Sequence, residues 1–192
     1  MISGILLAGG ESKRMGEPKL LMPFHGRTIL GKVVEDLLDS DVGEVVVVVG
    51  HMAEKMRKRL LGKPVKLAMN MHYRQGISSS IVAGLGLIDN CAKAVMIALG
   101  DQPLIGTTII NKLVKEYYNQ DKGIVIPTYE GRRGHPVIFS IRYKNELLGL
   151  KGDVGARQLF EQHLDDITEV VVNSSSVIID IDNLSDYRSL AG

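Results

Sequence analysis

The sequence has a single cysteine, few aromatic residues and no excess of charge of either sign. Cys91 is alone among 192 residues, which excludes an internal disulfide. Lys and Arg number 23 against 22 Asp and Glu, and the basic residues are scattered, so no run of them suits a nucleic-acid backbone. No apolar run approaches the roughly 20 residues of a membrane helix, and no basic leader precedes the first apolar segment. We therefore expect a cytoplasmic protein without a nucleic-acid or membrane partner.

Short runs rich in Val and Ile alternate with segments of helical period along the first two thirds of the chain. Such runs are typical of strands buried on both faces of a parallel sheet, with helices covering it on both sides. The expected strands are 4–8, 44–49, 65–69, 94–99 and 123–127, and the expected helices are 28–38, 51–61, 78–88 and 107–118.

The pattern changes in the last third of the chain, where turn residues and shorter apolar runs predict a small antiparallel extension. The elements expected there are a hairpin turn at 131–134, strands at 135–140, 169–172 and 177–181, and a loop and helix at 152–163. A closing helix follows, which Ser185 would cap. We predict one α/β domain over 1–192, in which 1–127 binds a nucleotide and 128–192 binds an acceptor and closes the fold.

The loop after the first strand has the composition of a phosphate site. It opens with Leu7-Ala8-Gly9-Gly10 and carries Arg14 and Lys19. Paired glycines let the backbone approach a ligand closely, and the two cations can neutralise phosphate charge. The loop is neither a dinucleotide fingerprint nor a Walker A motif, because it lacks G-x-G-x-x-G and Gly-Lys-Ser/Thr. The alternative is a glycine turn with two solvated cations.

Acidic residues follow two other expected strands. Asp101 stands where a buried strand ends, a costly position unless its carboxylate is solvated, hydrogen-bonded or bound to a cation such as Mg²⁺. Asp180 and Asp182 lie on one face of a strand, since side chains alternate. Each has a plainer role as well: Asp101 can cap a turn before Pro103, and the pair can introduce the next helix.

Two further polar segments are candidates for ligand contact. Gln75-Gly76 leads to Ser78-Ser79-Ser80 at a helix start, where free N–H groups suit an anion, although serines cap helices in general. His135 begins a later strand, where a lone histidine is more often a hydrogen-bonded structural residue. The other histidines and Cys91 lack metal-ligand spacing, so a zinc site is not expected.

Together these motifs resemble the molybdenum cofactor nucleotidyltransferases over nearly the whole chain. The matching motifs are Leu-Ala-Gly-Gly at 7–10, Arg-Met-Gly at 14–16, Gly-Asp-Gln-Pro at 100–103, Gly-His-Pro at 134–136, Gly-Asp-x-Gly-Ala-Arg at 152–157 and Asp-Ile-Asp at 180–182. The resemblance implies a Rossmann-like three-layer α/β/α nucleotidyltransferase fold with a mostly parallel sheet.

The same resemblance implies roles for individual residues. Lys19, Arg14 and Asp101 would be catalytic, and Asp101 would hold the metal with Asp182 or Asp180. The implied nucleotide-binding residues are Leu7, Ala8, Gly9, Gly10, Arg14, Lys19, Asn70, Gln75, Gly76, Ser79 and Asp101. The implied acceptor-binding residues are Arg132, Arg133, His135, Asp153, Gly155 and Arg157.

The later motifs look like the cytidylyltransferase branch of that family. The resemblance implies Mg²⁺-dependent transfer of CMP from CTP to molybdopterin, with Mn²⁺ as a substitute ion and release of pyrophosphate. The dinucleotide product would serve a recipient molybdenum hydroxylase. The opening Leu-Ala-Gly-Gly is instead typical of guanylyltransferase relatives, so GTP is an alternative. Another phosphorylated small molecule as acceptor, and a non-catalytic carrier of the cofactor, are further alternatives.

Overall fold

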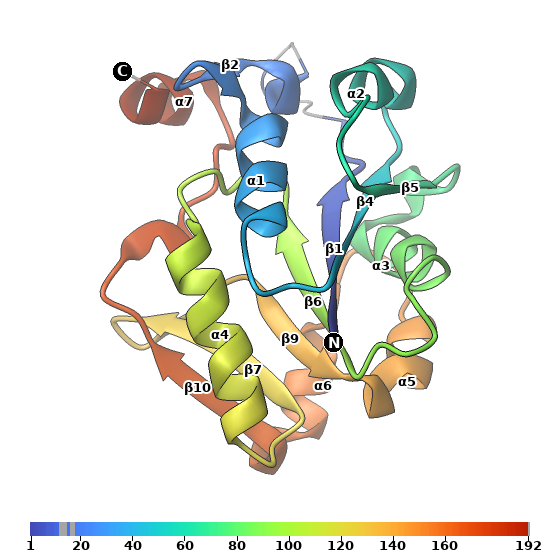
Figure 1. Ribbon diagram of the computed structural model, residues 1–192, viewed down its shortest axis with the longest axis vertical. Coiled ribbons are helices and arrows are strands. Elements are labelled where there is room, and N and C mark those ends of the chain that lie inside the picture. Colours follow the sequence, from blue (N-terminus) through green and yellow to red (C-terminus); the bar gives the residue numbers. More distant parts are fainter. Residues whose placement is uncertain (12–14, 16–17, 192) are drawn as a thin grey trace.

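The computed structural model describes residues 1–11, 15 and 18–191, and within them eight strands form one large mixed sheet (Figure 1). The strands of this sheet are β1 (Ile2–Ala8), β4 (Glu44–Val49), β5 (Lys66–Met69), β6 (Ala94–Leu99), β7 (Ile124–Tyr129), β8 (Arg132–Arg133), β9 (Val137–Ser140) and β10 (Ile167–Val171). Their order across the sheet is β5-β4-β1-β6-β9-β7-β10, and β8 pairs with β7. Only β8 and β9 run antiparallel to their neighbours.

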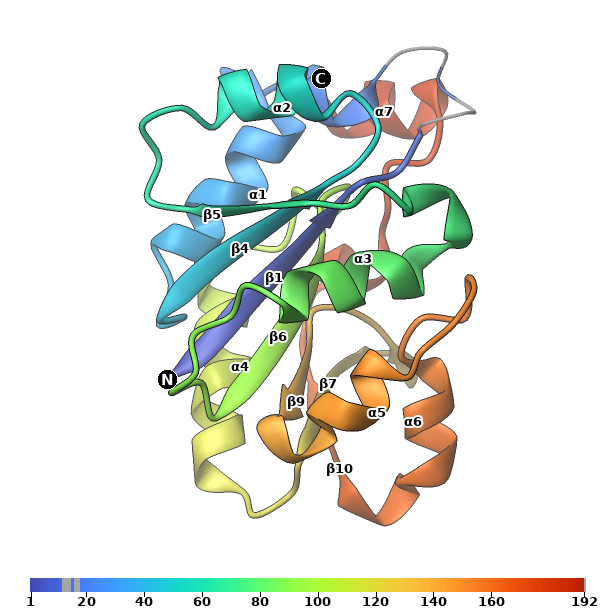
Figure 2. The ribbon, with the colours of Figure 1, turned by 90° about the vertical axis from the view of Figure 1, so that its right-hand side faces the viewer.

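Helices cover both faces of the sheet. They are α1 (Ile29–Leu38), α2 (Ala53–Arg59), α3 (Ile77–Leu85), α4 (Thr107–Asn119), α5 (Lys144–Leu148), α6 (Arg157–Gln162) and α7 (Leu184–Ala191). Figure 2 shows α1, α2 and α4 on one side and α3, α5 and α6 on the other. A short hairpin of β2 (Pro23–Phe24) and β3 (Arg27–Thr28) precedes α1.

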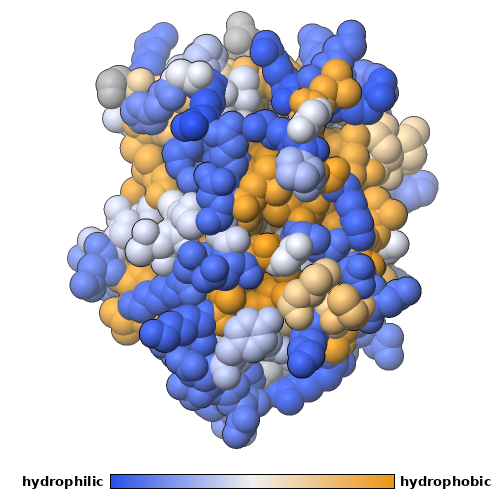
Figure 3. All heavy atoms as spheres, viewed as in Figure 1, coloured by the Kyte–Doolittle hydropathy of each residue, from blue (hydrophilic) through white to orange (hydrophobic). Residues whose placement is uncertain are grey.

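The two helical layers exist because the central strands are apolar on both faces. In β4, Val45, Val47 and Val49 pack with α1, whereas Val46 and Val48 pack with α3. On the face that carries α1 and α4, polar side chains dominate the surface, and apolar ones gather in the area between α1 and α2 (Figure 3). None of the described helices is both long enough and apolar enough to cross a bilayer.

The predicted three-layer α/β fold, with its mostly parallel sheet and small antiparallel part, is confirmed. A hairpin forms where one was expected, but its turn is at Glu130-Gly131, where both residues have positive φ, rather than at 131–134. Arg132 and Arg133, predicted to lie in the turn, instead form the strand β8. Helix α5 was not anticipated.

Two local predictions near the C-terminus are wrong. Residues 177–181 do not form a strand: Ser175–Ile178 is a 3-10 turn, and Ser174 Oγ accepts a hydrogen bond from Ser176 N. Such side-chain bonds to the local backbone compete with strand pairing. Ser185 does not cap α7 either, since Asn183 Oδ1 accepts hydrogen bonds from Ser185 N and Asp186 N. Asn183 is therefore the cap, and Ser185 lies inside the helix.

Candidate active site

A cleft of about 1060 Å³, the main cleft, lies at the carboxyl end of β1, where Gly9 and Gly10 leave the sheet. A Cβ on Gly9 would lie 3.3 Å from Ser80 Oγ and 3.5 Å from Gly50 N, so a side chain there would crowd Ser80. A Cβ on Gly10 would meet no atom of the described residues within 4 Å, which leaves room for a ligand beside this backbone.

Most residues that the sequence assigned to the nucleotide meet in the main cleft. Those that line it are Leu7, Ala8, Gly9, Gly10, Lys19, Gln75, Gly76 and Asp101, together with Asp182 and Asp153 from the other predicted groups. The cleft brings together the ends of β1 and β6, as expected for ligands of parallel sheets. Arg14, predicted to bind phosphates, lies outside the described residues.

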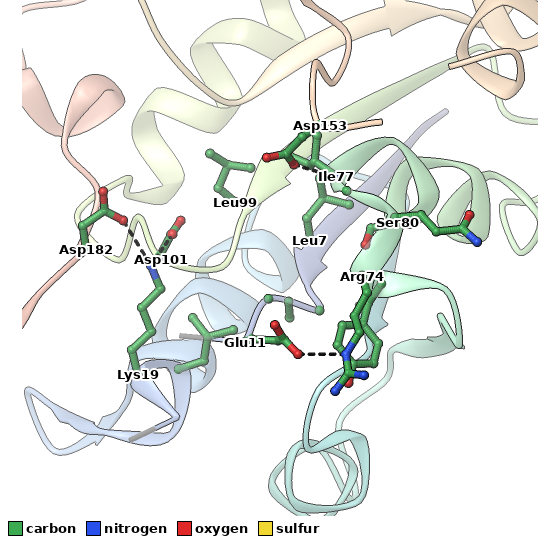
Figure 4. A pocket seen from close by; sticks show the side chains of 17 residues that line it. Leu7, Glu11, Lys19, Arg74, Ile77, Ser80, Leu99, Asp101, Asp153 and Asp182 are labelled. Carbon is green, nitrogen blue, oxygen red and sulfur yellow. Dashed lines mark hydrogen bonds and ion pairs between the residues drawn. The ribbon is translucent and has the colours of Figure 1, made fainter. Parts of the chain in front are cut away.

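Lys19 connects two carboxylates of the cleft, those of Asp101 and Asp182. Its Nζ lies 2.7 Å from Asp101 Oδ2 and 3.4 Å from Asp182 Oδ1 (Figure 4). Lys19 Nζ also donates a hydrogen bond to Ile181 O at 2.8 Å. The backbone reinforces this arrangement, because Ile181 N donates to Asp101 O at 3.0 Å. The segments after β6 and before α7 are therefore fixed against each other, with both carboxylates turned toward one cation.

The exposure of these groups suits exchangeable partners. The Lys19 side chain is 14% exposed, whereas Asp101 is 24% and Asp182 49% exposed. Among the described residues, no group of three or more His, Cys, Asp and Glu is arranged to hold a metal ion. Two converging carboxylates nevertheless fit Mg²⁺, which commonly takes one or two from the protein and completes its shell with water and substrate phosphates.

Asp180 has a different environment from Asp182. It does not line the main cleft, and its Oδ1 accepts a hydrogen bond from Gln102 Nε2 at 2.6 Å. Burial, and then the nearby charge of Asp101, raise the pKa of Asp180. Of the two alternatives for the second metal ligand, the geometry favours Asp182.

The segment before α3 forms another wall of the main cleft. Gln75 and Gly76 face the cleft, but Asn70 and Ser79 lie behind this wall and line a separate hollow. Asn70 Nδ2 donates to Ser79 Oγ at 2.9 Å and to Ser80 Oγ at 3.0 Å. Ser80, rather than Ser79, reaches the cleft.

The loop 152–155 is attached to the start of α3. Asp153 Oδ1 accepts a hydrogen bond from Ile77 N at 3.1 Å, and Gly152 O accepts one from Ser78 N at 3.2 Å. Gly76 has φ of 98°, and a Cβ there would lie 2.5 Å from backbone atoms of Gly152. Only glycine fits this contact, which joins the predicted acceptor region to the wall of the main cleft.

A second hollow of about 710 Å³ adjoins the main cleft and shares Ile77, Leu99 and Asp153 with it. The structure brings the predicted acceptor residues together along it: Arg132, Arg133, His135, Asp153, Gly155 and Arg157. Its apolar lining includes Phe139 and Phe160, whose rings stack 5.9 Å apart.

Charge in the second hollow is distributed unevenly. The Arg133 guanidinium lies 5.9 Å from the centre of the Phe160 ring and pairs with Glu169 at 2.7 Å. Burial lowers the pKa of His135 to about 4, with Arg157 lowering it further and Asp101 opposing. The imidazole is therefore neutral near pH 7.

Some residues of the main cleft were not predicted. Tyr73, Arg74 and Glu11 line it, and Arg74 Nε lies 3.1 Å from Glu11 Oε1 across the cleft (Figure 4). The hydrogen bond with Glu11 raises the pKa of Arg74. The sequence position of Arg74 could have indicated its place in the cleft, because it belongs to the same short segment as Gln75 and Gly76.

This fold has a glycine turn after β1, a lysine, a carboxylate after β6 and a second carboxylate before α7, all lining one cleft, and it defines a protein of the nucleotidyltransferase class. Residues 4–167 match the MobA-like NTP transferase domain family, to which the chain therefore belongs. The protein is a nucleotidyltransferase of this family.

Relatives in sequence carry different names. The chain is 30% identical over 173 residues to nicotine blue oxidoreductase of Paenarthrobacter nicotinovorans, covering 84% of this chain and 82% of that protein. It is 24% identical over 187 residues to the molybdenum cofactor cytidylyltransferase of Escherichia coli, and the match covers 97% of this chain and 93% of that protein.

A related structure contains a divalent metal. Rv0371c from Mycobacterium tuberculosis, solved in complex with manganese, has a TM-score of 0.85 and 25% identity to this chain. The similarity covers 99% of this chain and 97% of that one.

Proposed function

We propose that this protein transfers CMP from CTP to molybdopterin with release of pyrophosphate, using Mg²⁺, or Mn²⁺ in its place. The observation that carries the proposal is that Asp101 and Asp182 share the ammonium of Lys19 in the cleft that Gly9 and Gly10 line. Such a site accommodates a triphosphate together with a cation. The cytidylyltransferase relative supports the choice of reaction, and the manganese complex of the related structure supports a divalent ion.

In the proposed reaction, an oxygen of the acceptor phosphate attacks the α-phosphorus of CTP in line. The new bond joins this oxygen to the α-phosphorus, and the bond from the α-phosphorus to the bridging oxygen of pyrophosphate breaks. Because an acceptor phosphate is already ionised near neutral pH, the protein supplies alignment and charge neutralisation rather than a nucleophile.

The residues divide this work. Asp101 and Asp182 would hold the metal, which neutralises phosphate charge when bound. The open backbone at Gly10 would receive phosphate oxygens, and Lys19 would neutralise the leaving pyrophosphate. We assign the same role to Arg14.

We assign the second hollow to the acceptor. It is continuous with the main cleft through Leu99 and Asp153, so an acceptor phosphate can reach the nucleotide. Arg132, Arg133 and Arg157 would attract the anionic end of molybdopterin. The product would pass to a recipient molybdenum hydroxylase.

A nucleotide panel tests the proposal. Pyrophosphate release is measured with CTP, GTP, ATP or UTP, each with Mg²⁺, in the presence and absence of molybdopterin. We expect release with CTP that requires both the metal and the acceptor. Release with GTP alone would indicate a guanylyltransferase, and release that needs a different phosphorylated acceptor would reassign the second substrate. Tight binding of the cofactor without any release would indicate a carrier.

A further inference from the structure

Gln102 follows Asp101 directly, but its side chain lies in the interior rather than in the main cleft. The residue is 2% exposed, and its Nε2 donates to Asp180 Oδ1 at 2.6 Å. A carboxylate accepts hydrogen bonds and does not donate them, so this bond fixes which end of the amide faces Asp180. The amide oxygen of Gln102 is thereby turned to the other side.

That oxygen has no partner in the part of the chain that the structure describes. Gln102 Oε1 is buried and accepts no hydrogen bond. Buried side-chain acceptors normally have a donor, and an unsatisfied one is costly to maintain. A hydrogen-bond donor for Gln102 Oε1 must therefore come from outside the described side chains.

The residues around Gln102 indicate where a donor for its Oε1 could come from. Gln102 lines the second hollow, together with His135, Asp180 and Arg157. The hollow also contains apolar side chains such as Ile97 and the carboxylates of Asp153, Glu161 and Asp180, so an occupant would meet both kinds of surface beside the Gln102 amide. A donor on the occupant of the hollow would satisfy both partners.

We propose that Gln102 is a specificity-determining residue, whose Oε1 accepts a hydrogen bond from an N–H or O–H group of the acceptor substrate. The inference rests on the proposed function, in which the acceptor occupies the second hollow. A site with a buried acceptor discriminates strongly against molecules that lack the matching donor, because those leave its oxygen unpaired. Asp180 serves as the positioning residue that orients the amide.

The experiment compares Gln102→Met with the wild type, using molybdopterin as acceptor. Methionine is close to glutamine in length but accepts no strong hydrogen bond. We expect the KM for molybdopterin to rise about tenfold or more, the expected effect of one lost hydrogen bond in a buried site. The KM for CTP and kcat should stay within about twofold, since these depend on the main cleft. Gln102→Glu keeps an accepting oxygen and should have a molybdopterin KM below that of Gln102→Met.

A matched control and a direct measurement accompany these variants. Gln120→Met, at an exposed position after α4, should leave both KM values unchanged. If Gln102→Met does not fold, the side-chain amide signal of Gln102 in ¹⁵N-labelled wild type, followed during a titration with molybdopterin, decides instead. A shift of this signal supports the inference, and an unchanged signal overturns it.

The remaining outcomes are distinguishable. An unchanged molybdopterin KM in Gln102→Met, or an equal rise in both KM values, overturns the role of Gln102 and leaves the proposed function standing. A wild type that binds CTP and Mg²⁺ but not molybdopterin overturns the proposed function, and this inference with it.

Discussion

The main cleft and the second hollow use charge in opposite ways. In the main cleft, partly exposed carboxylates and an ammonium face one another within 2.7 to 3.4 Å. In the second hollow, arginines and the carboxylates of Asp153, Glu161 and Asp180 border apolar side chains, a neutral histidine and a buried amide. The first arrangement suits highly charged groups that change during a reaction, and the second suits recognition by shape and hydrogen bonds. Changes in the main cleft should therefore alter turnover, and changes in the hollow should alter acceptor binding.

The largest effect should come from Asp101→Ala. Removing a metal-binding carboxylate from the main cleft should lower kcat by about 10³-fold, comparable with the loss of other electrostatic groups that act on the transition state. Steady-state pyrophosphate release with CTP measures this. The variant should keep its far-UV circular dichroism, since no core volume is lost. The control is Asp121→Ala, at an exposed position, which should have normal turnover. Near-normal turnover of Asp101→Ala would contradict the role of Asp101 as a metal-binding residue.

Substitutions of Gly76 and Gly10, two glycines that line the main cleft, should affect different properties: the first stability and the second nucleotide binding. Gly76→Ala should lower the free energy of unfolding by about 2–4 kcal/mol, because its φ is positive and Gly152 leaves no space for a methyl group. Gly10→Ala, whose added methyl group would meet no described residue within 4 Å, should change stability by less than about 1 kcal/mol but raise the KM for CTP. Urea unfolding and steady-state kinetics measure the two effects. Equal stability of both variants would contradict the structural role of Gly76.

The sequence predicts the main cleft well for a physical reason. The apolar runs at 4–8, 44–49 and 94–99 had to be parallel strands, and the carboxyl ends of neighbouring parallel strands meet at one edge of the sheet. Gly9-Gly10 and Asp101 were therefore expected near each other, and the structure places them in one cleft.

What the sequence could not supply depends on side chains choosing between local partners. Asn70 has the same chemistry whether it contacts a ligand or, as here, two serines of α3. Asn183 and Ser185 are both good caps, and only the backbone decides between them. Gln102 belongs to a residue type that is mostly exposed, so nothing in the sequence indicated its burial.

The pH dependence of stability should report on the second hollow. Between pH 4 and 6.5 the unfolded chain binds a proton at His135 more readily than the folded protein does, because burial lowers the pKa to about 4. Unfolding free energy should thus be fully retained above about pH 6.5 and fall by at most about 3 kcal/mol as the pH drops toward 4. Urea unfolding at pH 7.5 and 4.5 measures this difference.

Substitutions show whether His135 causes this change of the unfolding free energy with pH. His135→Gln should flatten the dependence, whereas His72→Gln, at an exposed position, should leave it as in the wild type. An unchanged slope in His135→Gln would show that the hollow does not keep this imidazole neutral.

The smallest expected effect tests where the boundary between the two regions lies. Asp180 and Asp182 are two residues apart, yet Asp182 shares Lys19 with Asp101 while Asp180 bonds to Gln102. Asp182→Asn should raise the Mg²⁺ concentration needed for half-maximal turnover about tenfold, since it removes one anionic ligand. Asp180→Asn should change that concentration by less than about threefold and mainly raise the molybdopterin KM, because it disturbs the orientation of the Gln102 amide. A titration of turnover with Mg²⁺ at saturating CTP measures both variants. If Asp180→Asn has the larger effect on the metal requirement, the cation site extends into the second hollow. The two regions would then not be divided into one that binds charged groups and one that recognises the acceptor by shape.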